Sequence, residues 1–218
     1  MSLNYYKGLK KTQKYHEKNQ LYLKTRVFNT LKHLIKAFYN DDLKSGQFLL
    51  DLGSSDNSLV KIANDFGMKS KGLDIVDLDL EKDKIDLSDN TCDIVTAISL
   101  IEHLHRPENF LQEVKRVLKK NGYFIIITPD WSSNVKHFFD DPTHYHPYSR
   151  KSLRFVLELN DFRQIKILPW LVCKPAWMWK VPFSFLLAKM IPFTGNAPTW
   201  IPSILKGRSK TLLSICVK

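Results

Sequence analysis

The sequence Leu50-Asp-Leu-Gly-Ser-Ser-Asp-Asn-Ser58 contains the residues that decide the fold. The apolar run over 47–52 has the length and composition of a buried parallel strand, and the Gly/Ser/Asn cluster after it is typical of a tight turn. Gly53 lets the chain turn sharply as it leaves the strand, and the small Ser54 and Ser55 would let a ligand approach the backbone. Apolar residues then recur at helical spacing, so this stretch predicts a strand, a turn and a helix.

The alternation of strand and helix continues through the next 70 residues. Apolar runs over 70–75, 93–98 and 123–128 predict three more strands. Pro107 opens a helix whose last turn should include Lys119-Lys120. Strands separated by helices of this length imply right-handed crossovers and a parallel sheet, and such sheets bind ligands at the carboxyl ends of their strands.

Both flanks of this core also show regular patterns. Helical spacing predicts helices over 17–39 and 149–159, and short apolar runs predict strands over 163–168 and 211–217. The segment between these last two strands holds six of the ten prolines and four of the five tryptophans. We therefore expect a single domain over 1–218 with four parts, namely a basic helical segment (1–40), a ligand-binding core (41–168), an aromatic and proline-rich insert (169–210) and a last strand (211–218).

Composition excludes several protein classes. With 44% hydrophobic and 25% charged residues in 218, the chain is an ordinary globular sequence, so disorder and coiled coil are poor interpretations. The three cysteines are too few and too scattered for a disulfide framework. The first seven residues lack the apolar run of a signal peptide, and no stretch reaches 18 uninterrupted apolar residues. We expect a cytoplasmic protein.

The net charge of +11 is unevenly distributed. Residues 1–40 contain nine basic residues and one acid, and residues 162–218 contain nine basic residues and no acid. The middle contains 15 basic and 21 acidic residues, a net charge of −6. Basic ends favour a polyanionic partner such as nucleic acid, phospholipid headgroups or a phosphorylated substrate, although surface lysines can also be merely solvated.

A set of short motifs follows in one order along the chain: Asp51-Leu-Gly53, Asp74, Asp86-Leu87, Thr91–Val95, Ile101-Glu-His-Leu104, the Pro107 helix and Lys119-Lys-Asn-Gly122. In this order and spacing, residues 45–130 resemble the class I S-adenosylmethionine-dependent methyltransferases, and among them the small-molecule and saccharide types. The resemblance implies an α/β fold with a Rossmann-like, mostly parallel sheet of seven strands, helices on both faces and an antiparallel last strand.

The resemblance also implies a binding site for S-adenosylmethionine. The residues at the matching positions are Asp51, Gly53, Ser55, Asn57, Asp74, Asp86 and Ser99. In the family, the acid matching Asp74 holds the ribose and the acid matching Asp86 approaches the adenine amine. The family usually has glycine where this chain has Ser55 and Asn57, but Asn tolerates a left-handed backbone and Ser is small, so the turn can still form.

Two histidine motifs are candidates for work on the methyl acceptor. Glu102-His103 follows the strand over 93–98, and the segment Asp140-Asp-Pro-Thr-His-Tyr-His146 follows the strand over 123–128. The second segment resembles one found in methyltransferases associated with bacterial surface saccharides. We predict His103 and His144 as bases or acceptor-orienting groups, with Asp141 and His146 as neighbours, because a base with a pKa near neutrality suits an oxygen acceptor. The alternative is that these histidines only stabilise their loops.

No metal site is expected from the sequence. Some relatives bind a divalent ion through a Glu-x-x-Glu-His run and a distant His, but here Ser99 stands at the position of the first acid. Glu102, His103 and His144 would be left as the donors.

The aromatic and proline-rich insert over 169–210 has two interpretations. It is either a cap over the acceptor pocket or a patch that touches an anionic membrane, because Trp paired with Lys suits a lipid interface.

The predicted function is methyl transfer from S-adenosylmethionine to an oxygen of a small molecule or saccharide, which could be lipid-linked. Two alternatives stay open. One is a non-catalytic binding protein that retains the fold, because of Ser55 and Asn57. The other is a nucleic-acid methyltransferase, which the basic ends favour but which no recognised binding motif supports.

Overall fold

The computed structural model describes residues 17–74, 77–170, 190–193, 200–202, 205 and 209–218. Its helical elements are α2 (Glu17–Tyr39), α3 (Ser58–Asp65), η1 (Ile101–His103), α4 (Pro107–Val117), α5 (Trp131–Asn134), η2 (Phe138–Asp140) and α6 (Arg150–Leu159). Its strands are β1 (Phe48–Leu52), β2 (Lys69–Leu73), β3 (Cys92–Ile98), β4 (Leu118–Pro129), β5 (Arg163–Pro169) and β6 (Thr211–Val217).

The strands form one sheet in the order β2-β1-β3-β4-β6-β5. The first four are parallel neighbours, and β6 is antiparallel to both β4 and β5. The mostly parallel, Rossmann-like sheet and the antiparallel last strand confirm the predicted fold class. Among the described residues the sheet has six strands rather than seven, because residues 77–91 run as turns and loops between β2 and β3.

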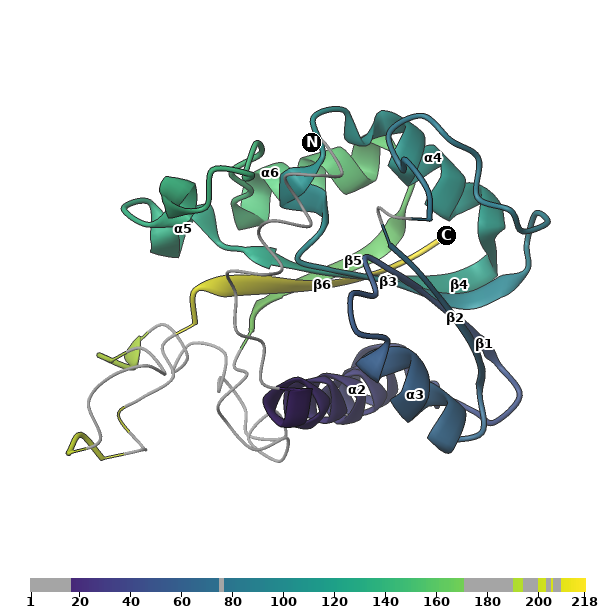
Figure 1. Cartoon of the computed structure of the whole chain (residues 1–218), viewed down its shortest axis with the longest axis horizontal. Coiled ribbons are helices and arrows are strands. Elements are labelled where there is room, and N and C mark those ends of the chain that lie inside the picture. Colours follow the sequence, from purple (N-terminus) through teal and green to yellow (C-terminus); the bar gives the residue numbers. More distant parts are fainter. Residues whose placement is uncertain (1–16, 75–76, 171–189, 194–199, 203–204, 206–208) are drawn as a thin grey trace.

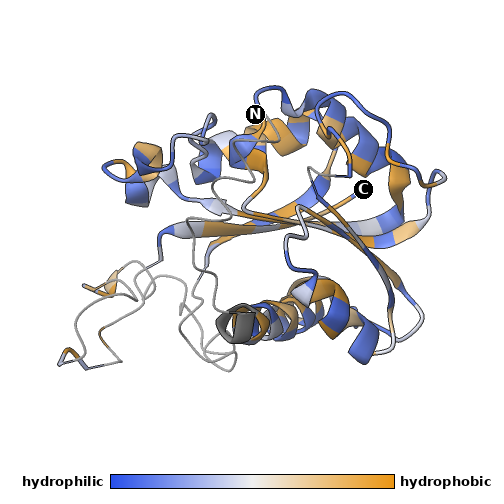
Figure 2. Ribbon diagram, viewed as in Figure 1, coloured by the Kyte–Doolittle hydropathy of each residue, from blue (hydrophilic) through white to orange (hydrophobic). Residues whose placement is uncertain are grey.

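Helices cover both faces of the sheet (Figure 1). On one face, α2 and α3 bury a cluster that includes Leu31, Ile35 and Leu59, while α4 and α6 cover the other with Phe110, Leu153 and their neighbours. The apolar sides of these helices face the strands (Figure 2), which places two cores on opposite sides of one sheet. This arrangement explains why residues 94–98 of β3 and 123–127 of β4 are almost entirely apolar, since a central parallel strand is buried on both faces.

The expected boundary after the Pro107 helix is wrong by one turn. The helix ends at Val117, and β4 begins at Leu118, so Lys119 and Lys120 belong to the strand and not to the helix. The pairing with β3 shifts register between Cys92 and Ile94, and Asn121 has a φ of 64°. The irregular start of β4 therefore takes up the residues that the sequence pattern assigned to the helix.

Most of the aromatic and proline-rich insert lies outside the described residues, including Trp177, Trp179 and most of the amphipathic run over 183–191. Its role stays a prediction. In the part of the chain that the structure describes, no helix combines the length and apolar character needed to cross a bilayer.

Candidate functional site

The loop after β1 adopts the conformation that glycines would favour. The φ angles of Gly53, Ser55 and Asn57 are 74°, 54° and 57°, so all three lie in the left-handed region. The backbone N–H groups of Gly53 and Ser54 both donate to the carbonyl of Leu73 at the end of β2, at 2.8 and 3.2 Å. The expectation that the turn forms despite Ser55 and Asn57 is therefore confirmed, at the cost of a left-handed serine.

Asp51 lies near the end of β1 with only 1% of its surface exposed. The hydroxyl of Thr96 donates to its Oδ1 at 2.6 Å, and its Oδ2 has no hydrogen-bond partner among the described residues. Burial raises the pKa of this carboxyl, although Lys24 and the Thr96 hydrogen bond oppose the shift. A buried carboxylate that is only half satisfied favours a ligand or solvent donor at this strand end.

Three predicted cofactor positions meet at the carboxyl edge of the parallel strands. Asp74 is buried directly after β2, where the backbone of this residue and of Asp77 closes a turn. Ser99 is exposed directly after β3, with a φ of 51°. A Cβ added to Gly53 would lie 3.4 Å from the side chain of Leu100, so the loop after β1 adjoins the end of β3.

Asp86 lies apart from these residues. Its side chain is exposed, and its two chain neighbours are held by α4, because Glu113 accepts from the N–H of Ile85 and Arg116 donates to the carbonyls of Ile85 and Leu87. Helix α4 runs from the carboxyl edge back to the start of β4, and both of these residues are in its last two turns. The fold therefore places Asp86 toward the amino edge of the sheet, away from Gly53 and Asp74.

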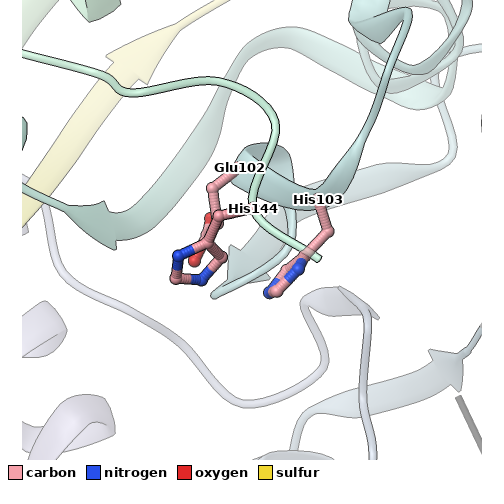
Figure 3. Close-up of side chains that lie close together, drawn as sticks. All are labelled: Glu102, His103 and His144. Atoms are coloured by element: carbon pink, nitrogen blue, oxygen red, sulfur yellow. The ribbon is translucent and has the colours of Figure 1, made fainter. Parts of the chain in front are cut away.

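The two histidine motifs come together from segments 40 residues apart. The ring centroids of His103, in η1, and His144 lie 4.8 Å from each other. The carbonyl of Glu102 accepts hydrogen bonds from the N–H groups of Tyr145 and His146, at 2.8 and 3.2 Å, which fixes the later segment against η1. The Glu102 carboxylate and the two imidazole rings gather at one point (Figure 3), and one ligand atom from each lies within 4.8 Å of the others.

Glu102 is fully buried beneath this pair. Its Oε2 accepts a hydrogen bond of 2.9 Å from Thr128 at the end of β4, and its Oε1 has no hydrogen-bond partner in the described part of the chain. Burial raises the pKa of this carboxyl to about 7, since desolvation disfavours the charged form more than the hydrogen bonds favour it.

The ring of His103 is oriented by Thr143. Its Nδ1 lies 3.1 Å from the Thr143 carbonyl and 2.8 Å from the Thr143 hydroxyl, which itself donates to Oδ1 of Asp141 at 2.6 Å. Because neither oxygen has a proton to give to the ring, Nδ1 must carry the hydrogen and Nε2 the lone pair. Burial, and next the neighbouring His144, lower the pKa of His103.

His144 has the same tautomer for the same reason. Its Nδ1 donates to the carbonyl of Phe138 at 2.6 Å, and the ring packs on that of Phe138 with centroids 4.6 Å apart. Its Nε2 lies 4.0 Å from Oδ2 of Asp141, so Asp141 is the predicted neighbour. His146, predicted as the other neighbour, instead turns its Nε2 toward the carbonyl of His105, at 3.0 Å.

Sequence reasoning underrated Glu102 and missed Thr143 and Thr128. Glu102 drew attention only as one of three potential metal donors, and the threonines carry no signal of their own in a loop and at a strand end. Only the pairing of β3 with β4 and the docking of residues 141–146 on η1 show that they orient the cluster.

A depression of about 580 Å³ lies at the opposite, amino edge of the sheet, with Lys115, Arg163 and Lys218 in its wall. It contains none of the predicted site residues. Lys115 is paired with Asp161 at 2.6 Å, and Lys218 donates to backbone carbonyls, so we assign the chemistry to the carboxyl edge.

Comparison with known proteins shows the family of the chain. The family model described as "Methyltransferase domain" matches residues 23–167, which is most of the chain. Among curated proteins, none matches. Many solved structures are similar.

Three of the similar structures illustrate the range. A SAM-dependent methyltransferase from Archaeoglobus fulgidus shares 21% identity with a TM-score of 0.59, over 87% of this chain and 94% of that one. One from Aquifex aeolicus shares 19% with a TM-score of 0.52, over 85% and 87%. A Haemonchus contortus phosphoethanolamine N-methyltransferase, solved with phosphomonomethylethanolamine and S-adenosylhomocysteine, shares 14% with a TM-score of 0.55, over 87% of this chain but 52% of that one. At these identities the likeness is one of fold.

Proposed function

The chain belongs to the family of methyltransferase domains, and from that premise we propose that it transfers the methyl group of S-adenosylmethionine to an oxygen of a small molecule or saccharide. The observation that carries the proposal is a juxtaposition at one sheet edge. The left-handed loop after β1 lies between Leu73, at the end of β2, and Leu100, just after β3, and the buried Asp74 directly follows β2. His103 comes soon after β3, and His144 packs against it.

The residues of the first half fit the cofactor. Ser55 and Asn57 keep the backbone that glycine would give, which supports a turn able to receive the methionine part and favours an enzyme over a non-catalytic protein. Asp74 is placed directly after β2 to accept hydrogen bonds from ribose hydroxyls. Asp51, Gly53 and Ser99 belong to the same proposed site, whereas Asp86 contributes least because it lies apart.

When bound, the cofactor supplies a methyl group on positively charged sulfur, which passes to the acceptor oxygen while the electron pair of the broken C–S bond stays on sulfur. The chain itself positions the acceptor and manages its proton. The Nε2 lone pairs of His103 and His144, fixed by the carbonyls that hold both Nδ1 atoms, face the acceptor hydroxyl and can take its proton.

An oxygen acceptor is favoured because the Nε2 atoms of two imidazoles suit a group that must lose a proton. The saccharide class is supported by the resemblance of Asp141-Pro-Thr-His144 to the segment noted above. Cytoplasmic location, and peripheral contact of the insert with an anionic membrane that would suit a lipid-linked acceptor, are part of the same proposal.

The test combines calorimetry with product analysis. We expect the purified chain to bind S-adenosylhomocysteine, and to transfer radiolabelled methyl from S-adenosylmethionine to hydroxyl groups in a panel of nucleotide-linked sugars and oligosaccharides. His144→Ala should lower the rate about 100-fold or more while cofactor affinity is kept.

Each other outcome identifies a different activity. Label on an amine would replace the oxygen acceptor, and label on RNA that declines as salt rises would support a nucleic-acid methyltransferase. A chain without affinity for S-adenosylhomocysteine would be a non-catalytic binding protein.

A further inference from the structure

One oxygen of the buried Glu102 carboxylate has no hydrogen-bond partner among the described residues. The side chain is fully buried, only one of its oxygens is hydrogen-bonded, and the other, Oε1, receives no donor from the described residues. A buried polar oxygen without a hydrogen-bond partner costs a fold free energy. The two rings nearest to it, those of His103 and His144, give it no proton, because their N–H groups are committed elsewhere.

The two histidines are arranged as metal ligands usually are. Each donates its Nδ1 hydrogen to a backbone carbonyl, of Thr143 and of Phe138, which fixes the tautomer and leaves an Nε2 lone pair. In metalloproteins such a bond from the non-ligating nitrogen sets the ring orientation and raises ligand basicity. Thr143, which contacts His103, is itself held in place by the hydrogen bond that its hydroxyl donates to Asp141.

We propose that Glu102, His103 and His144 bind a divalent transition-metal cation, with Zn²⁺ as the preferred ion. Two imidazoles and one carboxylate are a donor set of catalytic zinc and of other first-row metals, and they disfavour Mg²⁺, which prefers oxygen donors. One donor atom from each of the three residues lies within 4.8 Å of the others. Bonds of about 2.1 Å would require these atoms to move closer together when the cation binds. This reverses the expectation from the sequence that no metal binds.

Three protein ligands would leave coordination positions on the cation open, and the hydroxyl of the methyl acceptor could bind at one of them. This part of the inference rests on the proposed function. When bound, the cation would lower the pKa of an acceptor hydroxyl. The Asp141 carboxylate, whose Oδ2 lies 4.0 Å from Nε2 of His144, would be the group to receive the proton of that hydroxyl as the oxygen takes the methyl group from sulfur. The histidines would thus act through the cation and not as bases.

Metal binding can be measured without cofactor or acceptor. The chain, freed of any histidine tag and treated with chelator, is titrated with ZnCl₂ by calorimetry and with CoCl₂ by visible absorption. We expect one ion per chain and the visible d–d bands of four- or five-coordinate Co²⁺. His144→Ala and Glu102→Gln should each weaken binding about 100-fold or more, whereas His137→Ala, which removes an exposed histidine paired with Asp140, should not change it.

Circular dichroism of the chelated variants shows whether each one folds, and His103→Ala provides a second test of the site if Glu102→Gln does not fold. The inference is overturned if the wild-type chain binds neither ion, or if the cluster variants bind as tightly as His137→Ala. If the chain methylates saccharides but binds no metal, the metal site is overturned and the proposed function stands. If it binds metal but methylates only amines, the proposed oxygen acceptor is overturned and the metal site stands.

Discussion

The two halves of the candidate site are built differently. The cofactor half is made of strand ends and the turns that directly follow them, so the pairing of neighbouring strands in the sheet positions its residues. The acceptor half, Glu102, His103 and His144, is assembled from two segments that touch only because residues 141–146 dock on η1. The first half should therefore tolerate distant mutations, while the second should depend on the packing that brings its segments together.

The largest effect on stability is expected from Phe138→Ala, which removes a side chain that packs beneath the acceptor half. Phe138 is fully buried between Trp131 and His144, with centroids 5.5 and 4.6 Å from its own. Removing the ring should lower the free energy of unfolding by about 3–5 kcal/mol, measured by urea denaturation. Phe139→Ala, at a side chain that is 58% exposed, is the control and should cost far less. Equal losses in the two variants would mean that this packing does not hold the cluster.

Asp74→Asn should weaken S-adenosylhomocysteine binding about 10- to 100-fold, because a carboxylate that holds ribose hydroxyls makes charge-assisted hydrogen bonds. The matched variant Asp86→Asn should bind as the wild type does, because Asp86 lies toward the other edge of the sheet. Calorimetry on both variants decides the assignment. If Asp86→Asn lost the more affinity, our placement of the cofactor would be wrong.

Arg116→Gln tests how much the hydrogen bonds between α4 and the loop before β3 contribute to stability. Arg116 binds Glu113 at 2.8 Å and the carbonyls of Ile85 and Leu87, so its loss should cost about 1 kcal/mol at neutral pH. Arg116 lowers the pKa of Glu113, and a lowered pKa stabilises the fold above the unfolded value of about 4.3. The difference between wild type and variant should stay constant above about pH 5 and shrink as the pH falls through the folded pKa of Glu113. A difference that grew in acid would contradict this.

The smallest effect is expected from Ser55→Gly. A φ of 54° raises the free energy of a serine backbone but not that of a glycine backbone. Glycine, however, loses more conformational entropy on folding. The variant should gain about 0.5–1 kcal/mol in thermal unfolding and bind S-adenosylhomocysteine at least as well as the wild type. Asn57→Gly should change stability less, because Asn already tolerates this backbone. A destabilised Ser55→Gly would show that the serine side chain itself holds the loop.

The sequence was most informative where structure is local. The strand, turn and helix around Gly53, the amphipathic helix over 17–39 and the last strand over 211–217 all lie where the patterns predicted them. The error at Lys119-Lys120 arose because helix propensity continues past Val117 while pairing with β3 already begins at Leu118. Tertiary pairing overrode a local preference there.

What the sequence determined by itself is the order of strands and helices and the identity of the polar residues at strand ends, because alternation, turns and caps are properties of neighbouring residues. What only the tertiary structure decided is which of these residues meet. It separated Asp86 from Asp74, turned His146 away from His144, and buried Glu102 under two histidines of fixed tautomer. Contacts between segments 40 residues apart depend on how the sheet pairs and which loops dock, and no local pattern encodes that.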